Sequence, residues 1–246
     1  MRDRGMMVMT LAAALLLGSG VAHGQSGTCT PIASVPTAIT ASGAYCLTGN
    51  LTNTSIHAPA IAVNHNGVVI DFNGYRLLWE GSVSSGNPAV KIENQNVTIR
   101  NGLISDFDIG IESSGDATIV EDMRLHNNGL GIAIRQGAEG ALIRHNYIRL
   151  GNGIEIYGNN SAATLGAAGT GSARVIDNDI HGPDQGGSNG IAIYGQNAFV
   201  AGNRLGRLYS GIWFDLRTQA SGKYRDNLTT NVTLPYTGGT DAGNNN

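Results

Sequence analysis

The tetrapeptide Gly131-Ile132-Ala133-Ile134 returns without a change as Gly190-Ile191-Ala192-Ile193. Three other segments keep the plan of a glycine followed by apolar residues at every second position: Gly153-Ile154-Glu155-Ile156, Gly211-Ile212-Trp213-Phe214 and the shorter Gly110-Ile111. Alternation with period two and β-branched residues on one side is typical of a strand that buries one face. We call these segments the second strand type, because each follows a copy of another repeated strand.

That other strand, the first strand type, recurs along most of the chain. Its copies are Val68-Val69-Ile70, Val97-Thr98-Ile99, Ala117-Thr118-Ile119, Ala141-Leu142-Ile143, Ala173-Arg174-Val175, Ala198-Phe199-Val200 and Gly222-Lys223-Tyr224. Their third residues are 29, 20, 24, 32, 25 and 24 positions apart. Repeats of this length predict a solenoid, in which a single coil cannot bury its own apolar face and coils must stack. The longest step contains the Gly-, Ala- and Ser-rich segment 159–171, which we interpret as a loop excursion.

The composition agrees with a narrow, repetitive core. The 246 residues include 36 glycines and only 6% aromatic residues. No helical periodicity follows the N-terminal segment, so a fold of alternating strands and helices is not expected. The formal net charge of −3 gives no reason to expect nucleic acid as a partner.

The N-terminus has the features of an export signal. Arg2 and Arg4 precede the apolar run 6–17, and Ala22-His23-Gly24 fits a cleavage site, so residues 1–24 are predicted to be a signal peptide. The protein is therefore expected to be secreted or periplasmic, with no transmembrane segment. In such an oxidising compartment the chain's two cysteines, Cys29 and Cys46, are expected to form a disulfide.

The rest of the chain divides into three predicted parts. Residues 25–51, with the disulfide, are expected to cap the first coil, and residues 52–234 to form the β-helix. Residues 235–246 have almost no apolar surface to repay ordering, so we expect a flexible tail whose truncation is tolerated.

Asparagines mark one corner of the predicted coils. Four of them follow the end of a first-type strand by three residues: Asn146, Asn178, Asn203 and Asn227. We expect them to stack as a structural ladder, with left-handed backbone angles and with amides bonded to the coils above and below.

Two segments carry a resemblance to a known superfamily. Asn96-Val97-Thr98-Ile99-Arg100-Asn101-Gly102 and Ile70-Asp71-Phe72-Asn73-Gly74-Tyr75 resemble repeats of the pectate-lyase-like β-helix superfamily, in particular its Asn- and Gly-rich bacterial members, which include carbohydrate-processing and NosD-type periplasmic proteins. The resemblance implies an all-β, single-stranded right-handed parallel β-helix, which the repeats extend to about seven to eight coils. It implies no single activity, because the superfamily contains lyases, hydrolases, epimerases, esterases, adhesins and scaffolds. The signatures of its galacturonan hydrolases, uronan epimerases and calcium-dependent lyases are absent from this sequence.

The second strand type also turns a set of side chains outward. With Ile154 and Ile156 inward, Glu155 and Tyr157 point out, and stacked coils place further residues beside them in two columns. The candidate binding residues are Arg135, Glu155, Tyr157, Tyr194, Trp213, Asp215 and Arg217. Rings, arginines and carboxylates in a shallow groove suit an extended sugar polymer. The alternative is that the tyrosines only cover the sheet.

These features favour a secreted β-helix that contacts a polysaccharide or cell-surface glycan, by binding or as a structural element. The first alternative is a carbohydrate-active enzyme, a lyase, hydrolase or epimerase with an unfamiliar site, and the second is a surface or adhesion scaffold. Glu155 and Asp215 are expected roughly 11–12 Å apart, wider than a glycosidase pair. His126 beside Arg149 on the next coil is a further candidate base. No metal and no cofactor is expected.

Overall fold

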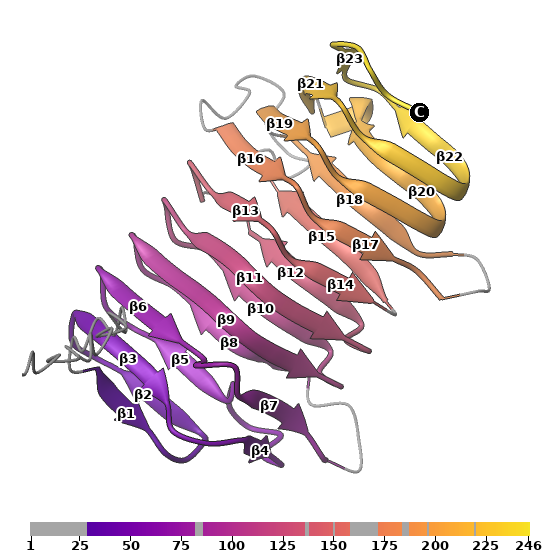
Figure 1. The fold of residues 1–246 in the computed structure, drawn as a ribbon. Helices are drawn as coiled ribbons and strands as arrows, with labels where there is room; N and C mark the ends of the chain where they lie inside the picture. The colour runs from indigo at the N-terminus through magenta and orange to yellow at the C-terminus, as the bar shows by residue number, and fades with distance from the viewer. Residues whose placement is uncertain are drawn as a thin grey trace, which may run out of the picture.

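The computed structural model describes residues 29–81, 86–135, 138–149, 151–157, 172–183, 187–195, 197–218 and 220–246. Over these ranges the chain forms an all-β parallel solenoid of about seven turns, whose coils follow one another from one end of the molecule to the other (Figure 1). The one helix in these ranges is a single 3-10 turn, Leu216–Thr218. None of the described segments is a helix long and apolar enough to cross a membrane. The predicted signal peptide and the predicted excursion 159–171 lie outside the described residues.

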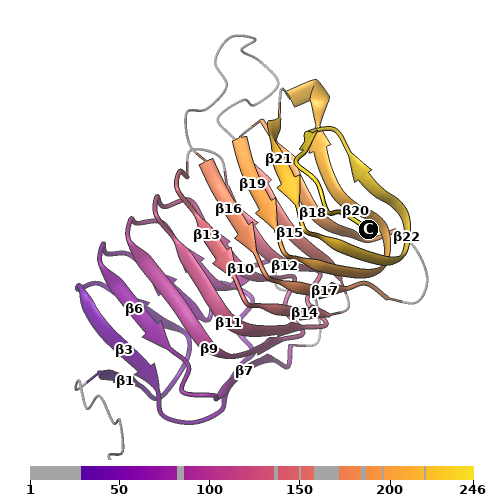
Figure 2. The same cartoon turned by 45° about the horizontal axis from the view of Figure 1, so that its top comes forward.

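The solenoid has three faces, each built from parallel strands of successive coils (Figure 2). Face 1 carries the first strand type and consists of β1 (Thr30–Ile32), β3 (Gly43–Leu47), β6 (Val68–Asp71), the first part of β9 (Val97–Ser105), the first part of β11 (Ile119–His126), β13 (Leu142–Arg144), β16 (Ser172–Ile176), β19 (Asn197–Ala201), β21 (Ser221–Arg225) and β23 (Thr240–Asp241). Face 2 consists of β4 (Leu51–Asn53), β7 (Arg76–Trp79), the second parts of β9 and β11, β14 (Tyr147–Arg149), β17 (Asp179–His181), and the starts of β20 (Arg204–Asp215) and β22 (Leu228–Thr237). Face 3 carries the second strand type and consists of β2 (Thr37–Ile39), β5 (Ile61–Val63), β8 (Pro88–Ile92), β10 (Ile109–Ser113), β12 (Leu130–Ile134), β15 (Asn152–Tyr157), β18 (Asn189–Tyr194) and the ends of β20 and β22.

The predicted fold class, a parallel β-helix, is confirmed. Both predicted strand types form sheets, and from the coil of β3, β4 and β5 onward face 2 supplies a third strand between them. Inward side chains stack in columns: the register of face 3 joins Ile111, Ile132, Ile154, Ile191 and Ile212, all of them fully buried. Each such burial contributes roughly 1.5–3 kcal/mol.

A glycine opens the second-type strands because the coils approach each other closely there. A Cβ on Gly131 would lie 2.7 Å from the carbonyl oxygen of Gly153, and a Cβ on Gly153 would lie 2.2 Å from that of Gly190. These spaces admit no side chain, so coil stacking itself requires the repeated glycine.

One copy of the first strand type is shifted from its predicted register. Ile99 pairs with Val120 rather than with Ile119, and Val120 pairs in turn with Ile143. Because alternate residues of a strand face opposite sides, the shift buries Val120 completely and leaves Ile119 partly exposed. The aligned segment is therefore Thr118-Ile119-Val120.

The predicted asparagine ladder is confirmed. The Oδ1 atom of Asn178 accepts hydrogen bonds from the backbone N and the Nδ2 of Asn146, both at 3.0 Å, and Asn203 does the same for Asn178. The prediction of left-handed angles at these asparagines is wrong, because the left-handed residue is the one before. Asp177, with φ 53°, turns the corner and leaves Asn178 free to point inward.

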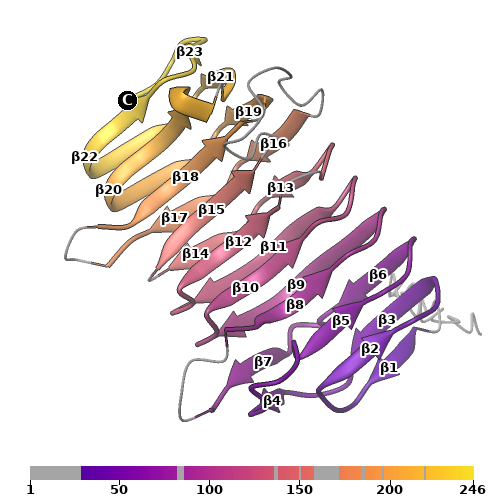
Figure 3. The same ribbon diagram turned by 180° about the vertical axis from the view of Figure 1, so that it is seen from behind.

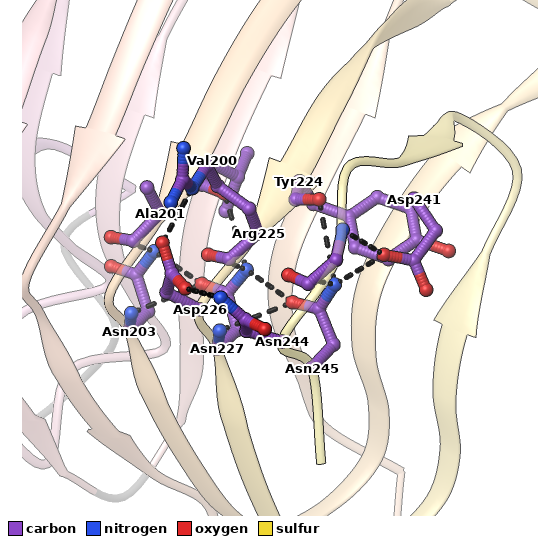
Figure 4. Close-up of polar contacts among 11 residues, drawn as sticks. Val200, Ala201, Asn203, Tyr224, Arg225, Asp226, Asn227, Asp241, Asn244 and Asn245 are labelled. Carbon is purple, nitrogen blue, oxygen red and sulfur yellow. Dashed lines mark hydrogen bonds and ion pairs between the residues drawn. The ribbon is translucent and has the colours of Figure 1, made fainter.

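The C-terminal segment, expected to be a flexible tail, makes contacts with the last coils. Tyr236 stacks on the buried Tyr224 with ring centroids 5.0 Å apart, and its hydroxyl donates to the carbonyl oxygen of Asn227. Asn245 extends the ladder, since its Oδ1 accepts from the backbone N and the Nδ2 of Asn227 at 3.1 Å each (Figure 4). Aromatic stacking and amide bonds of this kind favour an ordered segment, and the predicted flexibility of residues 235–246 stays a prediction.

The N-terminal segment joins the same sheets. The strands β2, β3 and β4 pair with β5, β6 and β7, and the buried Ile39 and Leu47 continue the core. The predicted disulfide is present between Cys29 and Cys46, whose Cα atoms are 5.7 Å apart. The role of this segment as a cap stays a prediction.

Candidate functional site

The candidate residues lie on the outer side of face 3, which Figure 3 views as the succession β8, β10, β12, β15, β18 and β20. The register confirms the first predicted column and, in the second, the part from Tyr157 to Asp215. One column runs Glu112, Ala133, Glu155, Ala192 and Trp213. In the other, Tyr157 pairs with Tyr194 and Tyr194 pairs with Asp215. Because β15 pairs directly with β18, these two strands belong to successive coils.

Three rings form a continuous row along the solenoid. The rings of Tyr157 and Tyr194 stack with centroids 4.8 Å apart and planes 11° apart. Trp213 meets Tyr194 at 5.4 Å with planes 78° apart, an edge-to-face contact. All three residues are partly buried. Each tyrosine therefore has one ring face covered by the other tyrosine, whereas no described ring lies parallel to the indole of Trp213.

Arg135 closes one end of this row. Its guanidinium carbon lies 5.4 Å from the centroid of the Tyr157 ring, a cation–π distance. The same group donates to Glu112 Oε2 from both Nε and a terminal nitrogen, at 2.8 and 2.7 Å. Glu112 shares its column with Glu155 but was not among the predicted site residues. It holds Arg135 in place over the ring.

Glu155 and Tyr157 form a hydrogen-bonded pair within one strand. The Tyr157 hydroxyl donates to Glu155 Oε2 at 2.5 Å. Burial, followed by this hydrogen bond, raises the pKa of Tyr157 well above its ordinary range. Burial also raises the pKa of Tyr194, with Glu155 and Asp215 adding to the shift. Both phenols are therefore protonated at neutral pH, and Glu155 already has a donor.

Asp215 and Arg217 form a second fixed pair at the other end of the row. Arg217 donates to the two carboxylate oxygens at 3.0 and 3.2 Å, and its backbone N donates to Oδ1. The hydrogen bond from the Arg217 side chain lowers the pKa of Asp215, which is buried, while the arginine itself extends into solvent. Thr218 ties this turn to the previous coil, since it accepts from the backbone N of Gly195 and donates to the carbonyl oxygen of Asp215.

The structure thus brings all seven predicted residues into one strip, which we call the aromatic strip. It does not bring together an acid–base pair. Glu155 is bonded to Tyr157, and Asp215 is bonded to Arg217, two coils and one column away. Among the described residues no group of three or more His, Cys, Asp or Glu side chains is placed to hold a metal ion.

Comparison with known proteins gives distant structural similarity only. No protein-family model matches the sequence, and no curated protein does. A solved structure, the catalytic domain of GH87 alpha-1,3-glucanase in complex with nigerose, has a TM-score of 0.43 at 12% identity over 88% of this chain and 63% of that chain. A variant of such a domain in complex with tetrasaccharides has a TM-score of 0.38 at 10% identity, with the same coverage. This chain spans less than two thirds of those chains.

The superfamily resemblance is therefore confirmed only as far as a parallel β-solenoid, and that assignment rests on the strand pairings of this chain. The narrower pectate-lyase-like family stays a prediction.

Proposed function

We propose that the aromatic strip binds an extended polysaccharide, and that the protein acts by binding or as a structural element rather than as an enzyme. The observation that carries the proposal is the unbroken row of Arg135, Tyr157, Tyr194 and Trp213 along the solenoid axis. A linear row over successive coils matches a linear ligand, because each coil adds ~4.8 Å of contact.

The members of the row offer different contacts. Trp213 is the candidate platform for the C–H face of a sugar, since its neighbours in the column, Ala192 and Thr237, have small side chains. The stacked tyrosines offer ring edges and, at Tyr194, a hydroxyl without a partner among the described residues. Glu155, with a second carboxylate oxygen, is placed to accept from sugar hydroxyls.

Binding is favoured over catalysis by the state of the carboxylates. A glycosidase needs one carboxyl group that holds a proton and a second one within ~5–9.5 Å. Asp215 is ionised and paired with Arg217, and Glu155 faces a phenol that keeps its own proton. An enzyme with another site and a scaffold without a ligand remain the two alternatives.

Export to an oxidising compartment is part of the proposal. The disulfide between Cys29 and Cys46 supports it, because such bonds persist outside the reducing cytosol. N-terminal sequencing of the exported protein tests the predicted signal peptide 1–24, and a start at Gln25 is the expected result.

A glycan array with the parent and three variants tests the binding proposal. We expect Trp213→Ala and Tyr194→Ala to weaken binding to the array hits by about 1 kcal/mol or more. The matched control is Tyr75→Ala, which removes an exposed tyrosine from the β6–β7 corner and is expected to bind like the parent. Equal binding by all four proteins would favour the scaffold, and release of sugar products by the parent would favour an enzyme.

A further inference from the structure

A second surface, on face 2, has a different character from the aromatic strip. Its strands follow one another as β7, β9, β11, β14, β17, β20 and β22 along one side of the solenoid (Figure 2). One outward column joins Arg124, Tyr147, Asp179 and Arg204. The neighbouring column joins His126, Arg149, His181 and Gly206. Arg76 continues the first column two coils earlier.

The arginines of face 2 differ from the others in having no carboxylate partner. Elsewhere, ion pairs join Arg100 to Asp71, Arg135 to Glu112, Arg144 to Glu121, Arg217 to Asp215, and Arg225 to Asp226. Among the described residues, no carboxylate pairs with Arg76, Arg124, Arg149 or Arg204, and all four are exposed. Outside face 2, Arg174 on face 1 is the one exposed arginine among the described residues that also has no carboxylate partner there.

The single carboxylate on these outward positions, Asp179, forms no ion pair with an arginine among the described residues. Asp179 Oδ1 is buried 2.7 Å from His181 Nε2, although the approach is not aligned as a hydrogen bond. Gly206 makes room for this imidazole, because a Cβ there would lie 2.7 Å from His181 Nδ1. The Tyr147 ring covers the other side, with centroids 6.1 Å apart. The Asp179 carboxylate thus contacts the His181 imidazole and not an arginine.

The outward positions of face 2 therefore carry a net charge opposite in sign to that of the whole chain. Four arginines and one aspartate give its outward positions a formal charge of +3, whereas the whole chain carries −3. From Arg76 to Arg204 the arginines cover five coil steps, or about 24 Å at ~4.8 Å per step. A ligand that contacts all four arginines must therefore be extended over this length.

We propose that face 2 is a second binding site, independent of the aromatic strip, which takes an extended anionic polysaccharide with carboxylate or sulfate groups. Guanidinium groups match such groups with two parallel hydrogen bonds each. Nucleic acid fits less well, because single strands are held by rows of rings on which bases stack. Face 2 offers one exposed ring, Tyr147, and that ring packs on His181.

Binding of the full chain to four probes tests the proposal: heparin, polygalacturonate, neutral dextran and an oligodeoxythymidine. We expect heparin or polygalacturonate to bind, with an affinity that falls as salt rises. In the double variant Arg124→Gln/Arg149→Gln the affinity is expected to fall at least about tenfold, since two charged hydrogen-bond donors are lost. Arg204→Gln provides a second, single-site variant if the double variant does not fold.

A control separates this site from general charge effects. Arg174→Gln removes an equally exposed arginine, also without a carboxylate partner among the described residues, from face 1. It is expected to bind the anionic polysaccharide like the parent. The proposal is overturned if Arg174→Gln weakens binding as much as the double variant, if dextran or the oligonucleotide binds more tightly than both anionic polysaccharides, or if neither of these binds.

Discussion

Tyr157 and Tyr194 lie on neighbouring coils with their rings stacked at 4.8 Å, and burial, with the Glu155 carboxylate adding to it, raises the pKa of both phenols. The contact fixes two outward side chains without help from the core. It also makes the stability of face 3 dependent on the protonation of these rings.

The first prediction concerns alkaline pH. An unfolded tyrosine loses its proton near pH ~10, while burial keeps Tyr157 protonated to higher pH in the folded chain. Above pH ~10 the unfolded state therefore binds fewer protons, so the free energy of unfolding falls as pH rises; below it this contribution is complete. In Tyr157→Phe we expect a smaller loss between neutral and alkaline pH, measured by urea unfolding. Tyr75→Phe is the control, and a loss in Tyr157→Phe equal to that of the parent would contradict the argument.

The second prediction tests the corrected register of β11. Val120→Ala removes a fully buried side chain and is expected to cost roughly 2 kcal/mol of unfolding free energy. Ile119→Ala, on the outer side, is expected to cost clearly less although it removes a larger group. The opposite order in thermal or urea unfolding would restore the register in which Ile119 points inward.

The third prediction concerns the asparagine ladder. Asn178→Ala leaves the backbone N and the Nδ2 of the buried Asn146 without their acceptor, which is expected to cost about 2 kcal/mol or more. Asn64→Ala, at an exposed position, is the matched control. If both variants melt at the temperature of the parent, the ladder does not contribute to stability.

The fourth prediction concerns the disulfide. Replacing Cys29 and Cys46 by serine releases a cross-link with a sequence separation of 17, which lowers the free energy of unfolding by about 3 kcal/mol on the loop-entropy estimate. A reductant should lower the melting temperature of the parent and leave that of the variant unchanged. If the variant melts at the same temperature as the untreated parent, the N-terminal segment needs no covalent link.

The sequence revealed the parts of the fold in which alternation extends over several residues. The segment Gly131-Ile132-Ala133-Ile134 places two isoleucines inward, enough to identify a strand and its outward columns. Face 2 stayed hidden because its strands are short: Tyr147–Arg149 has one inward residue, Ile148, and a single apolar residue has no period.

The candidate site was predictable in position but not in its bonds. Parity along β15 and β18 predicts that Tyr157 and Tyr194 are neighbours, which the register confirms. The bond from Tyr157 to Glu155 and the pair Arg135–Glu112 depend on the rotamers of long side chains that have several partners in reach. Neither the sequence period nor the strand register determines that choice.

The C-terminal segment shows how a period can be obscured by a single residue. Tyr224 pairs with Asp241, and the ladder residue follows Tyr224 by three positions but Asp241 by four, at Asn245. The last turn therefore contains one extra residue, so that its ladder asparagine does not have the three-residue spacing of the earlier corners. Composition alone then favoured a flexible tail.

The fifth prediction follows from this last rung. Asn245→Ala removes the acceptor for both nitrogens of Asn227, and we expect a loss of about 1 kcal/mol in unfolding free energy, less than at Asn178 because the site is only partly buried. Faster amide exchange at Asn227 is expected with it, because that amide loses its hydrogen bond. Thr240→Ala, an exposed change in β23, serves as the control. If Asn245→Ala matches this control in both stability and exchange, the segment behaves as the flexible tail that its composition suggests, and the ladder ends at Asn227.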